Sequence, residues 1–174
     1  MRAIQITSLV YVMRNRLWLG LLAALFGVCV AAMQPVMAAV DTHPQSGLDI
    51  RDVTLVSSEG AVFVFSLEIA KTAKARRTGL MWREQLPPKG GMLFIWPVSA
   101  PRAFWMKDTP LSLDILFFDA AGQLLNAHRD TTPFSLQSLP SQGPARYVVE
   151  LVAGSVQAHD LGPGSQLVLE KWME

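Results

Sequence analysis

The sequence has almost no cysteine: its single cysteine, Cys29, lies within an apolar run near the N-terminus. The residues before it, Phe26-Gly27-Val28, do not form the lipobox of a lipoprotein. If residues 1–39 are removed as a signal peptide, the mature chain contains no cysteine at all. Disulfides, thiolate catalysis and cysteine metal ligands are then excluded, so stability must come from a hydrophobic core.

Motifs of nucleophilic catalysis and of phosphate binding are also missing. The sequence contains no Gly-x-Ser-x-Gly motif. The pair Gly90-Gly91 precedes an apolar run that predicts a strand, whereas a phosphate loop leads into a helix. The sequence alone therefore leaves open whether the protein is an enzyme, and it identifies no catalytic residue.

Metal-binding patterns are weak. The three histidines lie far apart and match no zinc spacing: His43, His128 and His159. Three methionines near Trp105 offer soft ligands for Cu(I), but methionines close to aromatic residues usually fill a core: Met81, Met92 and Met106. We predict no metal and no cofactor.

The mature chain has no excess of positive charge. The whole sequence has a net charge of +1, but three of its 15 lysines and arginines lie in residues 1–39, which leaves 12 against 14 acids. A nucleic-acid-binding domain is usually basic throughout, so we predict no nucleic-acid partner. Six cations nevertheless lie between residues 71 and 89, with Glu84 as the only acid. This segment fits either an anion-binding patch or a solvated helix face.

Residues 1–39 are typical of an export signal. Arg14 and Arg16 precede the apolar run of residues 17–32, and Val36-Met37-Ala38 offers a cleavage site. The run is only slightly shorter than a membrane span, so an uncleaved anchor is the alternative. We expect a periplasmic or secreted protein that contacts the membrane only through residues 1–39 if they are retained. Residues 40–50 are interpreted as a linker.

Residues 51–174 are predicted to form a single β-rich domain. An apolar residue at every second position from Phe63 to Ile69 predicts a strand, which the turn Ser58-Glu59-Gly60 joins to an earlier one. A short helix is expected within residues 71–81, capped by Thr72 and ended by Gly79. Residues 131–144 are expected to be a loop because they contain three prolines. Further strands are expected at residues 92–96, 103–107, 113–118, 123–129, 147–151 and 166–172.

About eight short strands with one or two short helices indicate an all-β fold, either a sandwich or a barrel. A parallel α/β sheet would need several crossover helices, for which the chain has no room.

Several ordered motifs resemble a known family. The segments RRTGLMWREQL, GGMLFIW, FWMKDT, LDILFFD and YVVELVAG are similar to the pattern of the family called domain of unknown function 192. The resemblance runs from about Leu55 to Leu169 and implies a compact, mostly β domain, often exported, without an established activity. Two positions differ: Asp108 stands where the family usually has an amide, and Ser112 where it usually has a proline.

One candidate site lies in the segment FWMKDT. On a strand, Trp105, Lys107 and Thr109 share one face, which presents an indole beside an ammonium group and suits a sugar ring or a planar anion. In the alternative, Trp105 belongs to the core, and Lys107 and Asp108 form a local ion pair.

A second candidate site is formed by Arg76, Arg77 and Arg83, because a guanidinium binds carboxylate or phosphate oxygens through two parallel hydrogen bonds. Asp114 and Glu150 each lie in an apolar strand, and a buried carboxylate needs a cation or several donors. We therefore expect one of these arginines to pair with Asp114 or Glu150, and at least one other to face a ligand.

Together these observations predict an exported domain that binds a small anionic or sugar-like ligand or an envelope component. The expected ligand-binding residues are Arg76, Arg77, Arg83, Trp105, Lys107, Asp108 and Thr109, supported by Asp114 and Glu150. One alternative is a cell-envelope hydrolase that uses Asp108 and Asp114. The other is a protein-interaction module with no small-molecule site, whose partner the sequence does not identify.

Overall fold

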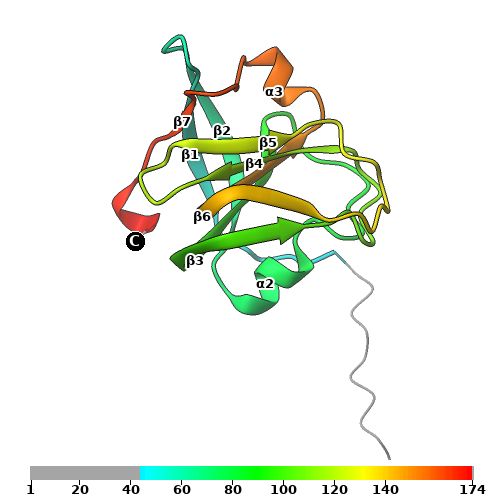
Figure 1. Cartoon of the computed structure of the whole chain (residues 1–174). Coiled ribbons are helices and arrows are strands. Elements are labelled where there is room, and N and C mark those ends of the chain that lie inside the picture. Colours follow the sequence, from blue (N-terminus) through cyan, green and yellow to red (C-terminus); the bar gives the residue numbers. More distant parts are fainter. Residues whose placement is uncertain (1–43, 174) are drawn as a thin grey trace, which may run out of the picture. The chain divides into compact units, whose positions relative to one another are not determined.

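Within residues 44–173, the part of the chain that the computed structural model describes, seven strands form one sheet (Figure 1). The predicted signal peptide, with Cys29, and His43 lie outside the described residues. The strands are β1 (Ile50–Val56), β2 (Val62–Ala70), β3 (Gly90–Phe104), β4 (Leu113–Phe118), β5 (Leu124–His128), β6 (Leu139–Val152) and β7 (Gln166–Leu167). The helices are α2 (Ala73–Thr78), α3 (Ser155–Ala158) and the 3₁₀ turn η1 (Lys171–Met173).

The sheet curves into a nearly closed barrel. Its strand order is β5-β4-β6-β3-β2-β1-β7, and every neighbouring pair is antiparallel except β2 and β3. The two ends of this order meet: the Leu124 amide donates to the Ser165 carbonyl at 3.0 Å, and the Leu167 amide donates to the Gly122 carbonyl at 2.8 Å. Of the two predicted architectures, the barrel is therefore the one that forms.

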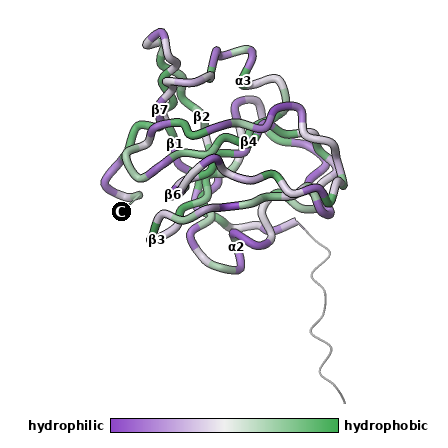
Figure 2. The backbone as a smooth tube through the Cα atoms, in the orientation of Figure 1, coloured by the Kyte–Doolittle hydropathy of each residue, from purple (hydrophilic) through white to green (hydrophobic). Residues whose placement is uncertain are grey.

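Both faces are buried along residues 90–95 of β3, all of β4 and residues 147–151 of β6. In Figure 2 hydrophobic stretches alternate with hydrophilic ones along the strands. The inner core fills the barrel and includes Leu67, Leu93 and Val149. The outer core lies between the sheet and the segment that carries α2, and it includes Phe94 and Val148. Met92 and Met106 also belong to this outer core, which is the packing role expected of methionine beside aromatic residues.

The predicted hairpin and helix are confirmed. β1 and β2 pair in an antiparallel register, and Phe65, Leu67 and Ile69 are buried as the alternation indicates. The Thr72 hydroxyl accepts the Ala75 amide at 3.1 Å at the start of α2, and Gly79 ends the helix.

Two strands extend further than the sequence predicts. β3 runs without interruption through Pro97 and Pro101 as a single strand of 15 residues, with register shifts that absorb the irregularity. β6 begins at Leu139, inside the segment predicted to be a loop, and Pro140 pairs with Ala103 of β3. At the C-terminal end, β7 contains only two residues.

The described part of the predicted linker packs on the domain. The Gln45 side-chain amide donates to the Ala75 carbonyl at 3.1 Å and to the Gly79 carbonyl at 2.8 Å. Leu48 packs against the outer core. None of the helices in the described part is long and apolar enough to span a bilayer.

Candidate functional site

A pocket of about 210 Å³ opens between α2, the loop that follows it and the aromatic end of β3. We call it the α2 pocket. Its lining includes Arg76, Arg77, Phe94, Trp96, Trp105 and Glu150. Arg76 and Arg77 lie in α2, Phe94 and Trp96 lie in β3, and Trp105 directly follows β3. Glu150 reaches the pocket from β6. The parallel pairing of β2 with β3 requires a long connection, and that connection carries α2 over the outer face of the sheet.

Glu150 is the most deeply buried ionisable group of this pocket. It lies opposite Met92 of β3 and Ile115 of β4, and only 5% of the residue is exposed. Its Oε2 atom has no hydrogen-bond partner within residues 44–173. Burial raises the pKa of Glu150 to about 8, so the carboxyl group is mostly protonated at neutral pH. A protonated carboxyl group is able to donate a hydrogen bond as well as accept one.

The end of α2 covers Glu150 closely because Gly79 lies there. Gly79 has a φ of +51°, a conformation that residues with a side chain rarely adopt. A Cβ atom at this position would lie 3.4 Å from the Phe94 ring and 4.0 Å from the Glu150 Oε2 atom. The helix end therefore approaches the carboxyl group through backbone alone.

Two arginines flank Trp96 at the rim. The guanidinium carbon of Arg76 lies 5.3 Å from the centre of the Trp96 ring, and that of Arg102 lies 4.6 Å from it. Backbone carbonyls hold both groups: Arg76 Nη1 donates to Ile95 at 2.9 Å and Arg102 Nη2 donates to Val98 at 2.7 Å. Burial, and to a lesser extent the charge of Arg76, lower the pKa of Arg102.

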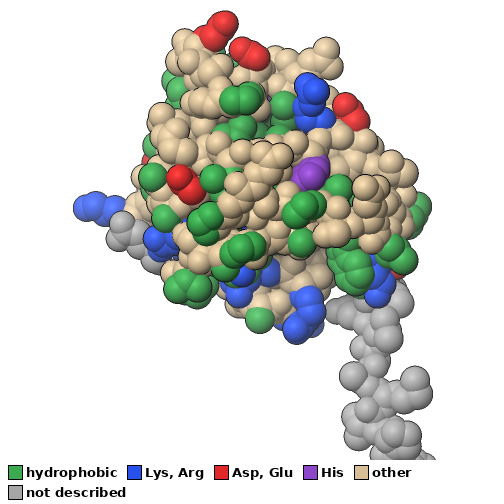
Figure 3. Space-filling model, viewed as in Figure 1, with side chains coloured by type: hydrophobic (Ala, Val, Ile, Leu, Met, Phe, Trp, Pro, Cys, Tyr) green, Lys and Arg blue, Asp and Glu red, His purple; other side chains and the backbone are tan. Residues whose placement is uncertain are grey.

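These cations have no carboxylate partner within residues 44–173. Arg76, Arg77 and Arg102 form no ion pair with the described residues, and the Arg77 side chain also forms no hydrogen bond with them. Figure 3 shows Lys and Arg side chains gathered around α2 and β3 on the visible face, with most of the acidic side chains further away. Positive groups that the protein does not neutralise attract anions.

Arg83 has a different place from Arg76 and Arg77, because α2 ends before it and it does not line the pocket. Its Nη1 and Nη2 atoms each lie 2.8 Å from an oxygen of Glu68, and Nη2 also donates to the Gln45 carbonyl at 2.6 Å. The prediction of an internal arginine–carboxylate pair is therefore confirmed, but the predicted partners, Asp114 and Glu150, are wrong. The loop after α2 passes over β2, which the sequence does not reveal.

The predicted strand of residues 103–107 ends early, and the strand face expected to include Trp105, Lys107 and Thr109 is wrong, because β3 ends at Phe104 and a turn follows. The Thr109 amide donates to the Met106 carbonyl at 3.1 Å, and Asp108 has a φ of +53°. Asparagine and aspartate adopt this left-handed conformation more easily than most residues. The turn therefore accepts an aspartate where the family pattern has an amide.

This turn divides the predicted site. Trp105 and Thr109 line the α2 pocket, whereas Lys107 and Asp108 do not. The Lys107 ammonium lies 3.9 Å from Asp108 Oδ2 and 5.6 Å from the centre of the Trp105 ring. The predicted ion pair and the predicted contact between indole and ammonium are both present, on an exposed turn.

Asp114 has a structural role. Its Oδ1 atom accepts the Asp130 amide at 2.9 Å and its Oδ2 atom accepts the Val156 amide at 2.7 Å. These bonds join β4 to the segment after β5 and to the start of α3. Neither Asp108 nor Asp114 lines the α2 pocket, so the geometry does not favour the hydrolase alternative.

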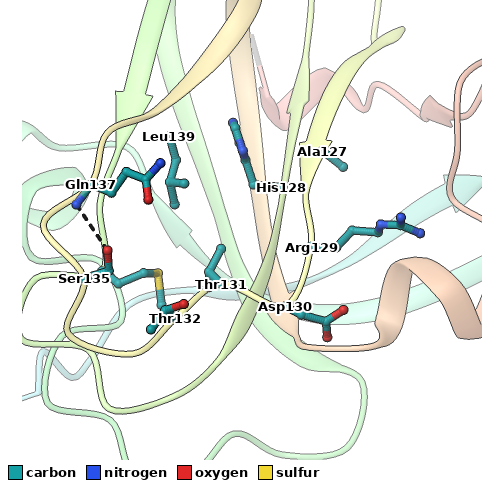
Figure 4. Close-up of a pocket in the computed structure, with 10 residues that line it drawn as sticks. Ala127, His128, Arg129, Asp130, Thr131, Thr132, Ser135, Gln137 and Leu139 are labelled. Atoms are coloured by element: carbon teal, nitrogen blue, oxygen red, sulfur yellow. Dashed lines mark hydrogen bonds between the residues drawn. The ribbon is translucent and has the colours of Figure 1, made fainter.

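A larger cavity of about 460 Å³ lies between the end of β5 and the start of β6 (Figure 4). The Arg129 and Asp130 side chains extend away from Ser135 and Gln137 in this view, so the polar groups do not converge. His128 Nε2 lies 2.9 Å from the Pro140 carbonyl oxygen. Among its described lining residues, no buried side-chain polar atom lacks a partner. The α2 pocket is therefore the stronger candidate.

Sequence reasoning missed Trp96 and Arg102 and gave Glu150 only a supporting role. Pro97 and Pro101 lie between Trp96 and Arg102, and prolines usually interrupt a strand. The sequence therefore did not predict that both residues belong to the single strand β3. The signal for Glu150 was present, since it is the only charged residue within the apolar run from Tyr147 to Ala153. Within residues 44–173 no group of three or more His, Cys, Asp or Glu side chains is placed to hold a metal ion.

Two solved structures are similar to this chain. One is a protein from Sinorhizobium meliloti 1021 whose name suggests a transcription regulator; it is 34% identical, the match covers 71% of this chain and 96% of that one, and the TM-score is 0.69. The other is a protein of unknown function from Novosphingobium aromaticivorans DSM 12444, at 32% identity, 74% and 91% coverage and a TM-score of 0.69. No curated protein matches the sequence significantly.

The family model DUF192, described as an uncharacterized ACR, matches residues 54–169. The match includes the helix α2, all of β3 and β6, and hence every residue of the α2 pocket. The chain therefore belongs to the DUF192 family.

Proposed function

We propose that the α2 pocket binds a small organic anion that carries hydroxyl groups, such as an acidic sugar. The observation that carries the proposal is the buried Glu150 carboxyl, whose Oε2 atom has no partner among the described residues although the group lines a cavity. A buried polar atom without a hydrogen bond costs about 1–3 kcal/mol. A ligand hydroxyl group supplies the missing bond.

The rim of the pocket suits the charged end of such a ligand. The Arg77 side chain is exposed and forms no ion pair or hydrogen bond with the described residues, so its guanidinium is available to a carboxylate. Arg76 and Arg102 add positive charge on either side of Trp96. The half-exposed ring of Trp105 offers an apolar face on which a sugar ring packs.

The size of the pocket limits the ligand. Pockets for drug-sized molecules usually measure about 300–1,000 Å³, whereas this one measures about 210 Å³. A single ring fits this volume better than a long chain does.

Binding is favoured over hydrolysis. Glycoside hydrolysis normally uses two carboxyl groups on opposite sides of the bond that breaks. Glu150 is the only acidic residue among those that line the α2 pocket in the described part of the chain. The charge of the chain outside residues 1–39, with 12 cations against 14 acids, does not favour the binding of nucleic acid.

The proposal is tested by calorimetric titration of the protein with glucuronate and with galacturonate at pH 6.5. Glucose serves as the uncharged comparison. We expect both acids to bind more tightly than glucose and Arg77→Ala to weaken their binding about tenfold, as for loss of one charge-assisted hydrogen bond. Arg129→Ala is the matched control, since it removes an exposed arginine that lines the larger cavity instead.

The pH dependence provides a second readout. As the pH rises through about 8, Glu150 becomes charged, so it stops donating a hydrogen bond and repels the anion. Affinity for the acids should therefore decline above pH 8 in the unaltered protein but stay level in Glu150→Gln. If neither acid binds, or if Arg129→Ala weakens binding as much as Arg77→Ala does, the proposal is wrong.

A further inference from the structure

Two exposed loops beside the α2 pocket are joined by backbone hydrogen bonds. The Met106 amide donates to the Ser135 carbonyl at 2.9 Å, and the Phe134 amide donates to the Thr109 carbonyl at 3.1 Å. The first loop follows β3 and the second precedes β6. In Figure 1 the loops of this region lie side by side at the right-hand edge of the domain.

These loops present large apolar side chains to solvent. Trp105 is 49% exposed, Phe134 61% and Leu136 68%. The bonded residues Met106 and Ser135 are the sequence neighbours of Trp105 and Leu136, respectively. We call these three residues the loop patch. Single exposed apolar residues are common on soluble proteins, but apolar residues grouped on linked loops mark an interaction surface.

One residue of the patch and one residue beside it have unusual backbone conformations. Phe134 has a φ of +59° and Trp82 a φ of +60°, which is uncommon for bulky residues. The Trp82 amide donates to the Asp108 carbonyl at 2.7 Å, so a third segment supports the first loop. A strained backbone that accompanies the exposed Phe134 ring suggests that this exposure has a use.

Positive charge borders the patch. The Lys107 ammonium lies 5.6 Å from the Trp105 ring, and Arg77 lines the same pocket as Trp105. Asp108 is the one acid paired there, 3.9 Å from Lys107. Exposed aromatic and aliphatic residues next to Lys and Arg are the composition of segments that lie in the headgroup region of a bilayer.

The described chain also begins on this side of the domain. The Gln45 side chain bonds to the Gly79 carbonyl, and Gly79 lines the α2 pocket together with Trp105. The apolar run of residues 17–32 ends about a dozen residues before Gln45. The sequence predicts that this run enters a membrane, and the described chain that follows it begins next to the α2 pocket.

From these observations we infer that the loop patch docks on the surface of a bilayer that contains anionic lipid. Trp105, Phe134 and Leu136 enter the interfacial region, and Lys107 and Arg77 meet the lipid phosphates. Arg77 and Trp105 also line the α2 pocket, whereas Phe134 and Leu136 do not, so variants of Phe134 and Leu136 test docking separately from ligand binding.

Co-sedimentation of residues 42–174 with lipid vesicles tests the inference. This segment is one compact unit, and the solved relatives consist almost entirely of the matching domain, so it folds on its own. We expect it to bind vesicles of phosphatidylglycerol and phosphatidylcholine in a 1:3 ratio. Binding should be much weaker to phosphatidylcholine alone or at high salt, because salt screens the charges.

The deciding variant is Phe134→Asn with Leu136→Ser, because asparagine tolerates the left-handed conformation at residue 134. We expect its partition coefficient to fall about tenfold or more, as for loss of two interfacial apolar side chains. Val62→Ser with Val64→Ser is the matched control, since these β2 residues are 64% and 45% exposed and lie away from the loops. The single variant Leu136→Ser, at the most exposed position, serves if the double variant misfolds.

Two outcomes would overturn the inference. In the first, the unaltered domain does not sediment with the anionic vesicles. In the second, the Val62/Val64 control loses as much binding as the loop variant, which would show that general surface hydrophobicity rather than the loop patch is responsible.

Discussion

The pH dependence of stability should reveal the buried Glu150 carboxyl directly. Burial raises its pKa from the ordinary 4.5 to about 8. Between these two values the folded protein keeps a proton on Glu150 that the unfolded chain has already released. The free energy of unfolding therefore falls as the pH rises from about 4.5 to about 8, and this contribution is constant above that range.

The expected magnitude follows from the two pKa values. Each pH unit in this interval lowers the free energy of unfolding by about 1.4 kcal/mol, so the whole interval corresponds to at most about 5 kcal/mol. Glu150→Gln preserves the shape of the side chain but cannot ionise. We expect this variant to match the unaltered protein near pH 4.5 and to exceed its stability by about 4 kcal/mol at pH 8.5.

Urea unfolding followed by tryptophan fluorescence at pH 4.5, 6.5 and 8.5 measures this difference. Trp96 and Trp105 lie in the same pocket as Glu150 and report on its unfolding. Glu59→Gln is the control, because Glu59 lies exposed in the turn between β1 and β2. Parallel stability curves for Glu150→Gln and the unaltered protein would refute the reasoning, since Glu150 would then have to be hydrated or paired.

Two further predictions test the packing of the fold. Asp114→Asn should destabilise the domain by about 1–3 kcal/mol in urea unfolding, because one of the two backbone amides that donate to Asp114, the part-buried amide of Asp130 or the buried amide of Val156, would face an NH₂ group. An unchanged midpoint would argue against this structural role. Gly91→Ala should cost about 3 kcal/mol or more, since its Cβ atom would lie 2.1 Å from a backbone carbonyl oxygen of β6. Gly162→Ala, whose Cβ atom would meet nothing within 4 Å, should be nearly neutral, and equal losses for the two glycine variants would contradict the close approach of β3 to β6.

Some of the fold could be predicted because the signals are local. The alternation of Phe65, Leu67 and Ile69 identifies the buried face of β2, since successive side chains of a strand point to opposite sides. Thr72 and Gly79 mark the ends of α2 because each supplies a specific backbone requirement at a helix terminus.

Other parts could not be predicted because they depend on neighbours distant in sequence. Pro101 and Pro140 normally end a strand, yet β3 and β6 continue through them, since the two strands pair with each other and shift register where the prolines lie. Conversely, the chain leaves β3 after Phe104, because the backbone at Met106 bonds to Ser135 instead of continuing the sheet.

The candidate site shows the same division. The sequence by itself determined a β-rich domain of the DUF192 family, a short capped helix, and the cations and aromatic residues that border the pocket. Only the tertiary structure decided that Arg83 pairs with Glu68, and that Glu150 lies unpaired under Gly79 beside Trp96. The physical reason is that a side chain's type is written in the sequence, whereas its burial and its partner depend on which strands become neighbours. Here β6 lies between β3 and β4, and α2 crosses their outer face.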